Sequence, residues 1–440
     1  MSARIVVMIV SLLAAMRPAV ADDIPVNAEP PPAAVVKPLP AAVVEPPPAA
    51  VVEPPPVLVT PPPPVAAEPP PAADPIYARA VEATERHLAG SVQLDYLATR
   101  HRASAPDQGL SGATVELSLK MTLDFGEHVS SNIKVCFACH GFDVGMAFFD
   151  LRVADELNIR AGRFTPAFGS FPLRHDPANH STSDKPLAYD MGRMVRLREW
   201  NEGVLPAPWV DNGIEINGSH FFGKRAQLDY AVYAINGPKG DSDGVDLDFK
   251  QSRSPERYYA DNNGEPALGG RVSATLDLTS SSILSFGGSV MAGHYDPAGK
   301  LRFSIIGADA SLQLGRVVLR AEALRRRTEI SLGEDPATRF RYGPGADGTF
   351  SRFTLKDGFD AEAEIRLGKL ELIGRWDGLR RIGNVLASSE LRSESAVLRY
   401  TAAAAYKLTG ALRLKTSVEL YDFSDFEDEL AVHLGIAGPF

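Results

Sequence analysis

The sequence of 440 residues has only two cysteines, Cys136 and Cys139, so a single small disulfide clip is the most that it can form. Outside residues 5–16 it also lacks any run approaching the roughly 20 apolar residues that a membrane-spanning helix needs. Its basic residues are dispersed and not gathered on one element, which argues against a nucleic-acid-binding protein. No convincing set of nucleophile, base and acid stands out, so the sequence does not indicate an enzyme.

The N-terminus has the features of an export signal. Arg4 precedes the apolar run Ile5–Met16, and Ala19-Val20-Ala21 offers a small-residue cleavage site. We therefore expect residues 1–21 to be a signal peptide and the mature chain to be exported without a helical anchor.

Residues 22–75 differ from the rest of the chain in being rich in proline. Charged residues recur every eight positions in this region, at Glu29, Lys37, Glu45 and Glu53. Such a segment has no apolar face to bury, and its prolines favour extended polyproline II. We expect a low-complexity, disordered spacer in the periplasm, with a docking strand for an envelope partner as the alternative. Residues 76–90 would form a short amphipathic helix or another entry segment into the next region.

The clearest positive signal is a two-residue period of apolar side chains, which predicts strands that face two different environments. It is strongest in residues 115–125, 359–367, 412–420 and 430–440. Short breaks, as at Gly315 and Gly368, mostly alternate with long ones, as at 166–211, 237–266 and 329–357. Short turns on one side and long loops on the other are typical of outer-membrane barrels. A secreted β-sandwich is the alternative.

The predicted fold is all-β, a transmembrane antiparallel barrel over residues 91–440. We count fifteen strand candidates, at 91–101, 113–125, 146–155, 157–165, 212–222, 226–236, 267–278, 282–295, 301–314, 316–328, 358–367, 369–380, 393–407, 411–423 and 429–440. Bacterial single-chain barrels have an even number of strands, so one strand is missed or split, and about sixteen are expected. A barrel of this size encloses an aqueous channel.

Short motifs at strand ends resemble a known family. They are Asn158-Ile159-Arg160-Ala161-Gly162-Arg163-Phe164, Pro166-Ala167-Phe168-Gly169, Tyr230–Gly237 and Gly307-Ala308-Asp309-Ala310, and they look like the phosphate-selective porin O and P type. The final Phe440 similarly resembles the last residue of bacterial outer-membrane barrels. The resemblance implies a sixteen-stranded channel in the outer membrane, in contact with lipid and lipopolysaccharide and commonly a trimer. It also implies an inward-folded loop at 166–211 and passage of small polar or anionic solutes.

Strand parity places several basic residues toward the predicted lumen. They are Lys120, Arg152, Arg160, Arg320, Arg366 and Arg375. They are candidates for lining the pore, and the simpler interpretation is the general polarity of any water-filled barrel.

The motif Cys136-Phe137-Ala138-Cys139-His140 has the C-x-x-C-H pattern of covalent c-type haem attachment. Its two thiols could form thioethers to one porphyrin while the imidazole binds the iron. A disulfide clip in an oxidising compartment and a metal site are the alternatives. The candidate second ligands of a haem iron are Met146, His128, His175 and His180.

Counting back from Phe440, with short turns in the periplasm, puts the predicted 126–145 loop at the outer or lumenal end. A haem there would suit a redox porin that relays electrons across the membrane. Because one haem cannot bridge about 30 Å of hydrocarbon, such a protein needs a periplasmic partner cytochrome.

Overall fold

The computed structural model describes residues 84–100, 112–138, 141–190, 203–249, 252, 260–341, 349–389, 391–425 and 427–440. The expected signal peptide (1–21) and proline-rich spacer (22–75) lie outside these residues. The expected lead-in at 76–90 is already strand from Thr84 onward, and the part before Thr84 is not described.

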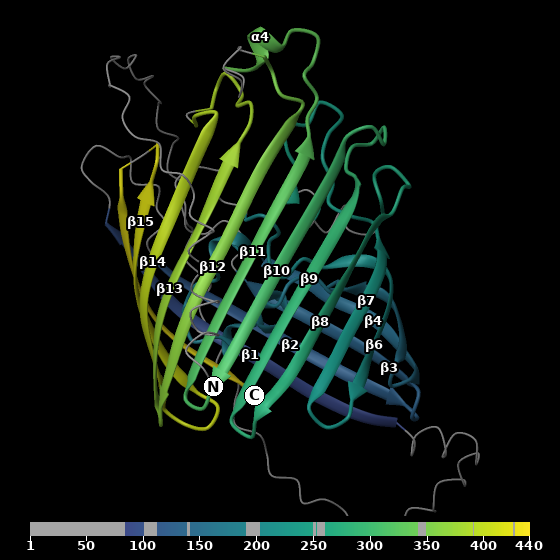
Figure 1. The fold of residues 1–440 in the computed structure, drawn as a ribbon, viewed down its shortest axis with the longest axis vertical. Coiled ribbons are helices and arrows are strands. Elements are labelled where there is room, and N and C mark those ends of the chain that lie inside the picture. The colour runs from purple at the N-terminus through teal and green to yellow at the C-terminus, as the bar shows by residue number, and fades with distance from the viewer. Residues whose placement is uncertain are drawn as a thin grey trace, which may run out of the picture. The chain divides into compact units, whose positions relative to one another are not determined.

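Sixteen antiparallel strands close into a barrel (Figure 1). Each strand pairs with its neighbours in the chain, and β1 pairs with β16 from Ser91↔Pro439 to Arg100↔Leu430 to complete the ring. The strands are β1 (Thr84–Arg100), β2 (Gly112–Phe125), β3 (Val129–Ala138), β4 (Gly141–Ala154), β5 (Leu157–Phe164), β6 (Asp211–Phe222), β7 (Ala226–Ile235), β8 (Ala267–Thr279), β9 (Ser282–His294), β10 (Arg302–Leu314), β11 (Val317–Glu329), β12 (Phe353–Leu367), β13 (Leu370–Ile382), β14 (Glu394–Lys407), β15 (Arg413–Phe423) and β16 (Glu429–Pro439). The predicted fold and strand number are confirmed.

The strand that the sequence prediction missed is β3. Residues 126–145 were expected to be one loop, but Val129–Ala138 pairs with β2 on one side and with β4 on the other. Its alternation is weak because Ser131 stands at an outward position that other strands fill with a large apolar residue. The register of the β3–β4 pair shifts between Lys134 and Val135, but the extra residue is Gly145 on β4, so this shift does not alter the period of β3. Barrel strands carry a weak sequence signal individually, so such a strand is easily taken for a loop.

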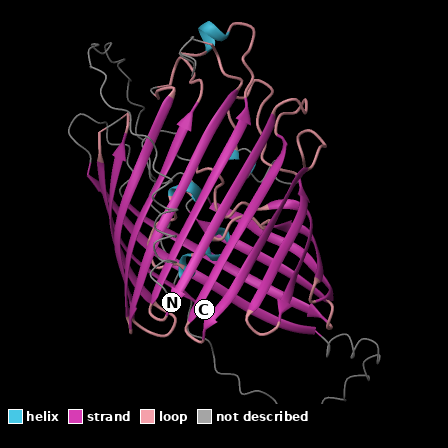
Figure 2. Ribbon diagram, viewed as in Figure 1, coloured by secondary structure: helices cyan, strands magenta, loops and turns pink. Residues whose placement is uncertain are grey.

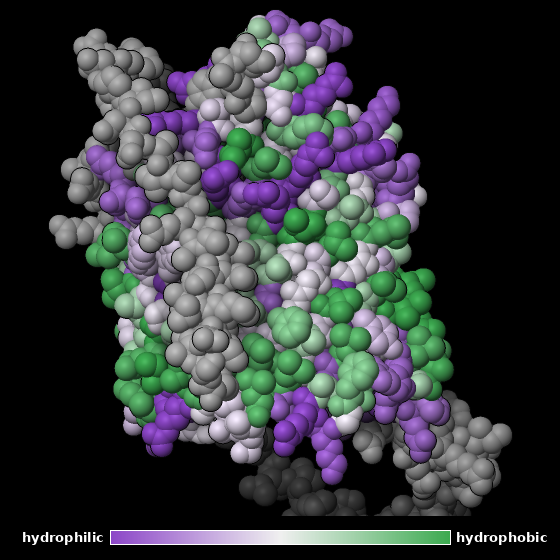
Figure 3. Space-filling model, in the orientation of Figure 1, coloured by the Kyte–Doolittle hydropathy of each residue, from purple (hydrophilic) through white to green (hydrophobic). Residues whose placement is uncertain are grey.

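Apolar side chains face outward and polar side chains face the lumen. On β16, Val432 and Leu434 are exposed, whereas His433 between them is fully buried. The outer face carries a belt of exposed apolar residues, and Figure 3 shows this belt between more polar rims. Members of the belt include Val115, Leu119, Ile214, Ile216, Val232, Val272, Val290, Ile306, Val418 and Leu434. This is the opposite of a soluble protein and is the distribution expected where the surroundings are hydrocarbon.

The two ends of the barrel differ in the length of their connections. At one end, here called the short-turn end, the chain reverses within a few residues, as at 223–225, 315–316 and 368–369. Gly315 and Gly368 adopt φ of 57° and 67° in these turns, which is the left-handed region that glycine enters without strain. The start of β1 lies at the same end, because Thr84 pairs with Phe125 beside the β2–β3 turn. The C-terminus lies there too, because Pro439 of β16 pairs with Ser91 in the first half of β1 (Figure 1).

The opposite end carries long connections, among them 236–266 and 330–352, and α4 (Pro336–Arg339) lies there (Figure 1). Among the described residues, no helix has the length and apolar character that crossing a membrane requires.

Candidate functional site: a loop folded into the barrel

The connection between β5 and β6 turns into the barrel instead of extending away from it. This inner loop comprises residues 165–210, of which 165–190 and 203–210 are described. Its described part contains three short 3-10 turns, η1 (Phe171–Arg174), η2 (Pro177–Asn179) and η3 (Leu187–Tyr189). Helical turns are visible inside the ring of strands in Figure 2. Packing of η2 against β1 and β16, and of η3 against β12 and β13, shows that the loop crosses the lumen.

The first anchor of the loop is Glu322 on β11. Its carboxylate accepts hydrogen bonds from the backbone N–H groups of Ser170 at 2.9 Å and Phe171 at 3.1 Å, and from the Tyr189 hydroxyl. Burial, followed by the charge of Glu322, raises the pKa of Tyr189 well above its usual value. The phenol therefore stays protonated and donates a hydrogen bond to Glu322.

Gly169 makes this approach sterically feasible. It has a φ of 67°, and a Cβ atom there would collide with the Tyr189 hydroxyl and the Glu322 carboxylate. Its N–H donates to the Ser289 hydroxyl of β9 at 3.0 Å. Another residue at this position would be strained and would push the loop away from Glu322.

The second anchor is the wall formed by β13 and β14. The Leu187 N–H donates to Asp377 at 2.7 Å, and the Arg375 guanidinium donates to the Thr182 hydroxyl and the Asp184 carbonyl, both at 3.0 Å. Arg399 donates to Asp377 at 3.0 Å. The side chains of Arg399 and Asp377 are 0% exposed, so the loop covers this part of the wall completely.

The third anchor lies across the lumen on β3. Lys134 forms an ion pair with Asp176 of the loop and lies 3.2 Å from the Nε2 atom of His175. Burial, together with the charge of Lys134, lowers the pKa of His175 from 6.5 to about 4. At neutral pH the imidazole is therefore uncharged, which limits its repulsion with the lysine.

Ion pairs on β11–β14 present their cations to the lumen. Arg366 is 40% exposed and its partner Glu364 is 5% exposed. Lys407 is 32% exposed and Glu371 is 2% exposed, and the corresponding values are 18% for Arg320 and 6% for Glu362. The carboxylates thus lie behind the cations. Toward the long-loop end the order reverses, since Asp246 is more exposed than its partner Arg326.

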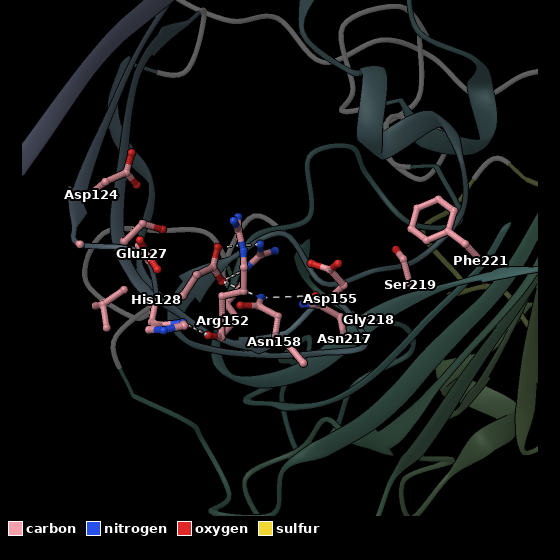
Figure 4. Close-up of a pocket in the computed structure, with 16 residues that line it drawn as sticks. Asp124, Glu127, His128, Arg152, Asp155, Asn158, Asn217, Gly218, Ser219 and Phe221 are labelled. Atoms are coloured by element: carbon pink, nitrogen blue, oxygen red, sulfur yellow. Dashed lines mark hydrogen bonds and ion pairs between the residues drawn. The ribbon is translucent and has the colours of Figure 1, made fainter. Parts of the chain in front are cut away.

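A cavity of about 890 Å³ opens at the short-turn end (Figure 4). The β2–β3 turn, the β4–β5 turn and the end of β6 line it, with Glu127, Arg152, Asp155 and Ser219 on its wall. We call this cavity the vestibule. Its walls are mostly polar and carry charges of both signs, as suits a compartment filled with water.

The basic residues singled out from the sequence fall into four places. Arg152 and Arg160 line the vestibule, and Arg160 is paired with Asp150 at 2.8 Å. Arg320 and Arg366 share Glu364, at 2.8 and 2.6 Å, and Arg375 lies beneath the inner loop. Lys120 stands opposite Lys134 in the β2–β3 register. The structure therefore does not bring the six together at one point.

The haem motif is only partly described. Cys136 lies on β3 opposite Ser118, whereas Cys139 and His140 lie outside the described residues. Met146 of β4 pairs with Lys134, which lies two positions before Cys136 on β3. His175 contacts the same lysine.

The other two proposed iron ligands are placed differently. His128 lies eight positions before Cys136, at the short-turn end, which corresponds to about 27 Å along a strand. This distance excludes His128 as a second ligand of a haem attached at Cys136. His180 is buried against Phe171, with ring centroids 5.8 Å apart.

Sequence reasoning missed most of the residues that hold the loop. They include Lys134, Glu322, Asp377 and Arg399, together with Glu419 and His433, which lie beside Asp184 of the loop. The alternation of β11–β16 marks the members on these strands as polar positions on a half-apolar strand. It gives no sign of which polar positions meet the loop.

Comparison with known proteins shows the barrel fold. No family model and no curated protein matches the sequence. Among solved structures, Salmonella typhi OmpF in complex with daunomycin matches with a TM-score of 0.52 and 11% identity, over 82% of this chain and 99% of that chain. The outer membrane channel DcaP of Acinetobacter baumannii matches with a TM-score of 0.50 and 14% identity, over 82% and 98%. The likeness to the phosphate-selective porin O and P type stays a prediction from the strand-end motifs.

Proposed function

We propose that this protein is a bacterial outer-membrane porin, a passive channel through which small polar or anionic solutes diffuse. The observation that carries the proposal is a closed sixteen-strand barrel whose polar interior is narrowed by a loop fastened to its wall. A porin needs an apolar outer surface, a polar lumen filled with water and a constriction that limits solute size. The exposed apolar belt, the polar inner face of the barrel and the inner loop correspond to these three requirements.

The dimensions support a membrane location. β10 and β11 have 13 residues each, which gives a length of about 44 Å and, at a tilt of about 40°, a height of about 34 Å. This exceeds the apolar band of about 25 Å that outer-membrane barrels present to lipid. The exposed belt thus contacts membrane lipid, and the polar rims contact lipopolysaccharide on the outer side.

Orientation follows from the connections. Short turns face the periplasm in outer-membrane barrels and long loops face outward. Because β1 starts at the short-turn end, we include in the proposal that the preceding proline-rich segment lies in the periplasm. The trimeric state implied by the family resemblance is part of the same proposal.

The preference for anions rests on the exposure of charged side chains. Where the cation of a pair is more exposed than its carboxylate, as for Arg366, Lys407 and Arg320, a solute meets positive charge first. Because a low-dielectric wall focuses the field of such charges, local anion concentration rises.

The test is reconstitution of the mature protein in planar bilayers with a potassium chloride gradient. Stepwise conductance increments and a reversal potential of the sign given by chloride permeation are expected. Absence of conductance from protein that migrates as a folded barrel overturns the channel, and a cation-selective reversal potential overturns the anion preference alone.

A redox porin is the second candidate. Cys136 lies on the same face of β3 as Lys134, and Lys134 contacts the inner loop. A haem attached through Cys136, Cys139 and His140 would therefore sit at the lumen wall. A partner cytochrome would have to supply or accept its electrons, since one haem cannot span the membrane.

A further inference from the structure

A group of one imidazole and two carboxylates lies where the inner loop meets β15 and β16. His433 comes from β16, Glu419 from β15 and Asp184 from the loop, and their candidate ligand atoms all lie within 4.8 Å of one another. The Nε2 atom of His433 is 2.9 Å from the Oδ2 atom of Asp184 and 3.9 Å from the Oε2 atom of Glu419. All three side chains are buried.

The histidine is oriented by a fourth residue. Asp95 of β1 approaches the Nδ1 atom of His433 at 2.8 Å, and both side chains are fully buried. A proton on Nδ1 is thereby fixed toward Asp95, and Nε2 is aimed at Asp184 and Glu419. Proteins use this carboxylate–histidine arrangement behind metal-binding imidazoles, because it sets the tautomer and raises the basicity of the ligating nitrogen.

The Nε2 atom itself lacks a satisfactory hydrogen bond. Within the described part of the chain it finds no hydrogen-bond partner of acceptable geometry, in spite of the short approach of Asp184. A buried polar atom in this condition is destabilising unless something else satisfies it. A ligand that binds Nε2 and both carboxylates would satisfy this atom in place of its direct 2.9 Å contact with Asp184.

We propose that His433, Glu419 and Asp184 bind a divalent transition-metal ion of the zinc type, which fastens the inner loop to the barrel wall. Zinc binds imidazole nitrogen and carboxylate oxygen at about 2.0–2.2 Å, so its tetrahedral ligand atoms stand roughly 3.3–3.6 Å apart. The observed separations of 2.9 and 3.9 Å lie on either side of that range. An imidazole among the donors favours zinc over calcium or magnesium, which prefer oxygen alone.

Arg399 already places a positive charge beside the two carboxylates with which a metal ion would have to interact. Its Nη1 atom is 3.3 Å from the Oε2 atom of Glu419 and 3.8 Å from the Oδ2 atom of Asp184, so one positive charge is already close to both carboxylates. The rival occupant of the remaining space is a proton on Nε2, which would pair His433 directly with Asp184. Metal analysis distinguishes the two occupants, because a bound zinc ion is detected and a proton on Nε2 is not.

The experiment uses folded mature protein in detergent, stripped with a chelator, dialysed, equilibrated with Zn²⁺ and analysed for bound metal by mass spectrometry. About one zinc per chain is expected, and His433→Gln and Asp184→Asn should each lose it. The matched control is His294→Gln, which alters a histidine near the long-loop end that pairs with Glu265 at 2.7 Å and should retain the zinc.

Folding of each variant is checked by its heat-dependent electrophoretic shift. If His433→Gln does not fold, Glu419→Gln and Asp184→Asn provide the same comparison. Failure of the wild type to hold zinc, or zinc that persists in His433→Gln and Asp184→Asn, overturns the proposal. Channel conductance is measured separately, so loss of the metal site leaves the proposed porin function standing.

Discussion

Replacing Glu322 by alanine should release the inner loop from β11. The carboxylate accepts hydrogen bonds from the Ser170 and Phe171 N–H groups at 2.9 and 3.1 Å, and also from the Ser170 and Tyr189 hydroxyls. A hydrogen bond to a charged group contributes about 1.5–3 kcal/mol, and the released donors recover part of this by binding water. We take about 3 kcal/mol for the whole set, which lowers the ratio of docked to undocked loop roughly a hundredfold.

The assay is single-channel recording in planar bilayers. Glu322→Ala should show larger conductance steps or frequent excursions to a larger conductance, because an undocked loop no longer narrows the lumen. The matched control is Glu364→Ala on β12, which removes a lumenal carboxylate bound to Arg320 and Arg366 at 2.8 and 2.6 Å. Those partners belong to the wall and not to the loop.

Two results would refute this reasoning. If Glu322→Ala forms a folded barrel whose conductance and current noise equal those of the wild type, Glu322 does not hold the loop. If Glu364→Ala changes the current as much as Glu322→Ala does, the effect comes from lumenal charge and not from loop release.

Three further predictions follow from the charges and the cysteine motif. Because burial lowers the pKa of His175 from 6.5 to about 4, the undocked loop binds more protons than the docked loop between these values, so docking should weaken as pH falls from 6.5 toward 4. Current noise should rise over that interval, and a His175→Gln variant whose noise rises equally would contradict it. Arg366→Glu combined with Lys407→Glu should shift the reversal potential toward cation selectivity. Arg325 is exposed and pairs with Asp357, and its replacement by glutamate should leave the reversal potential near the wild-type value. Haem-peroxidase staining of the mature protein after denaturing electrophoresis should be positive if haem is attached, and Cys136→Ser should abolish it; an unstained wild type, produced together with the haem-attachment machinery, removes the redox porin.

The sequence by itself determined the class of fold. A strand with lipid on one face and water on the other needs an apolar residue at every second position, so the pattern is written locally and can be read without the partner strands. β16 shows this, since Val432 and Leu434 face outward while His433 is buried. β3 was missed because Ser131 interrupts the apolar series of a strand of only 10 residues.

Only the tertiary structure decided what the lumen contains. Parity predicts that Arg375 points inward, but not that Thr182 and Asp184 of a distant loop cover it. The meeting of Asp184 with Glu419 and His433 joins positions more than 230 residues apart, and no local period in the inner loop announces it. The physical reason is that strand faces are set by alternation over neighbouring residues. Loop docking is set instead by hydrogen bonds and ion pairs that exist only once the barrel has closed around the loop.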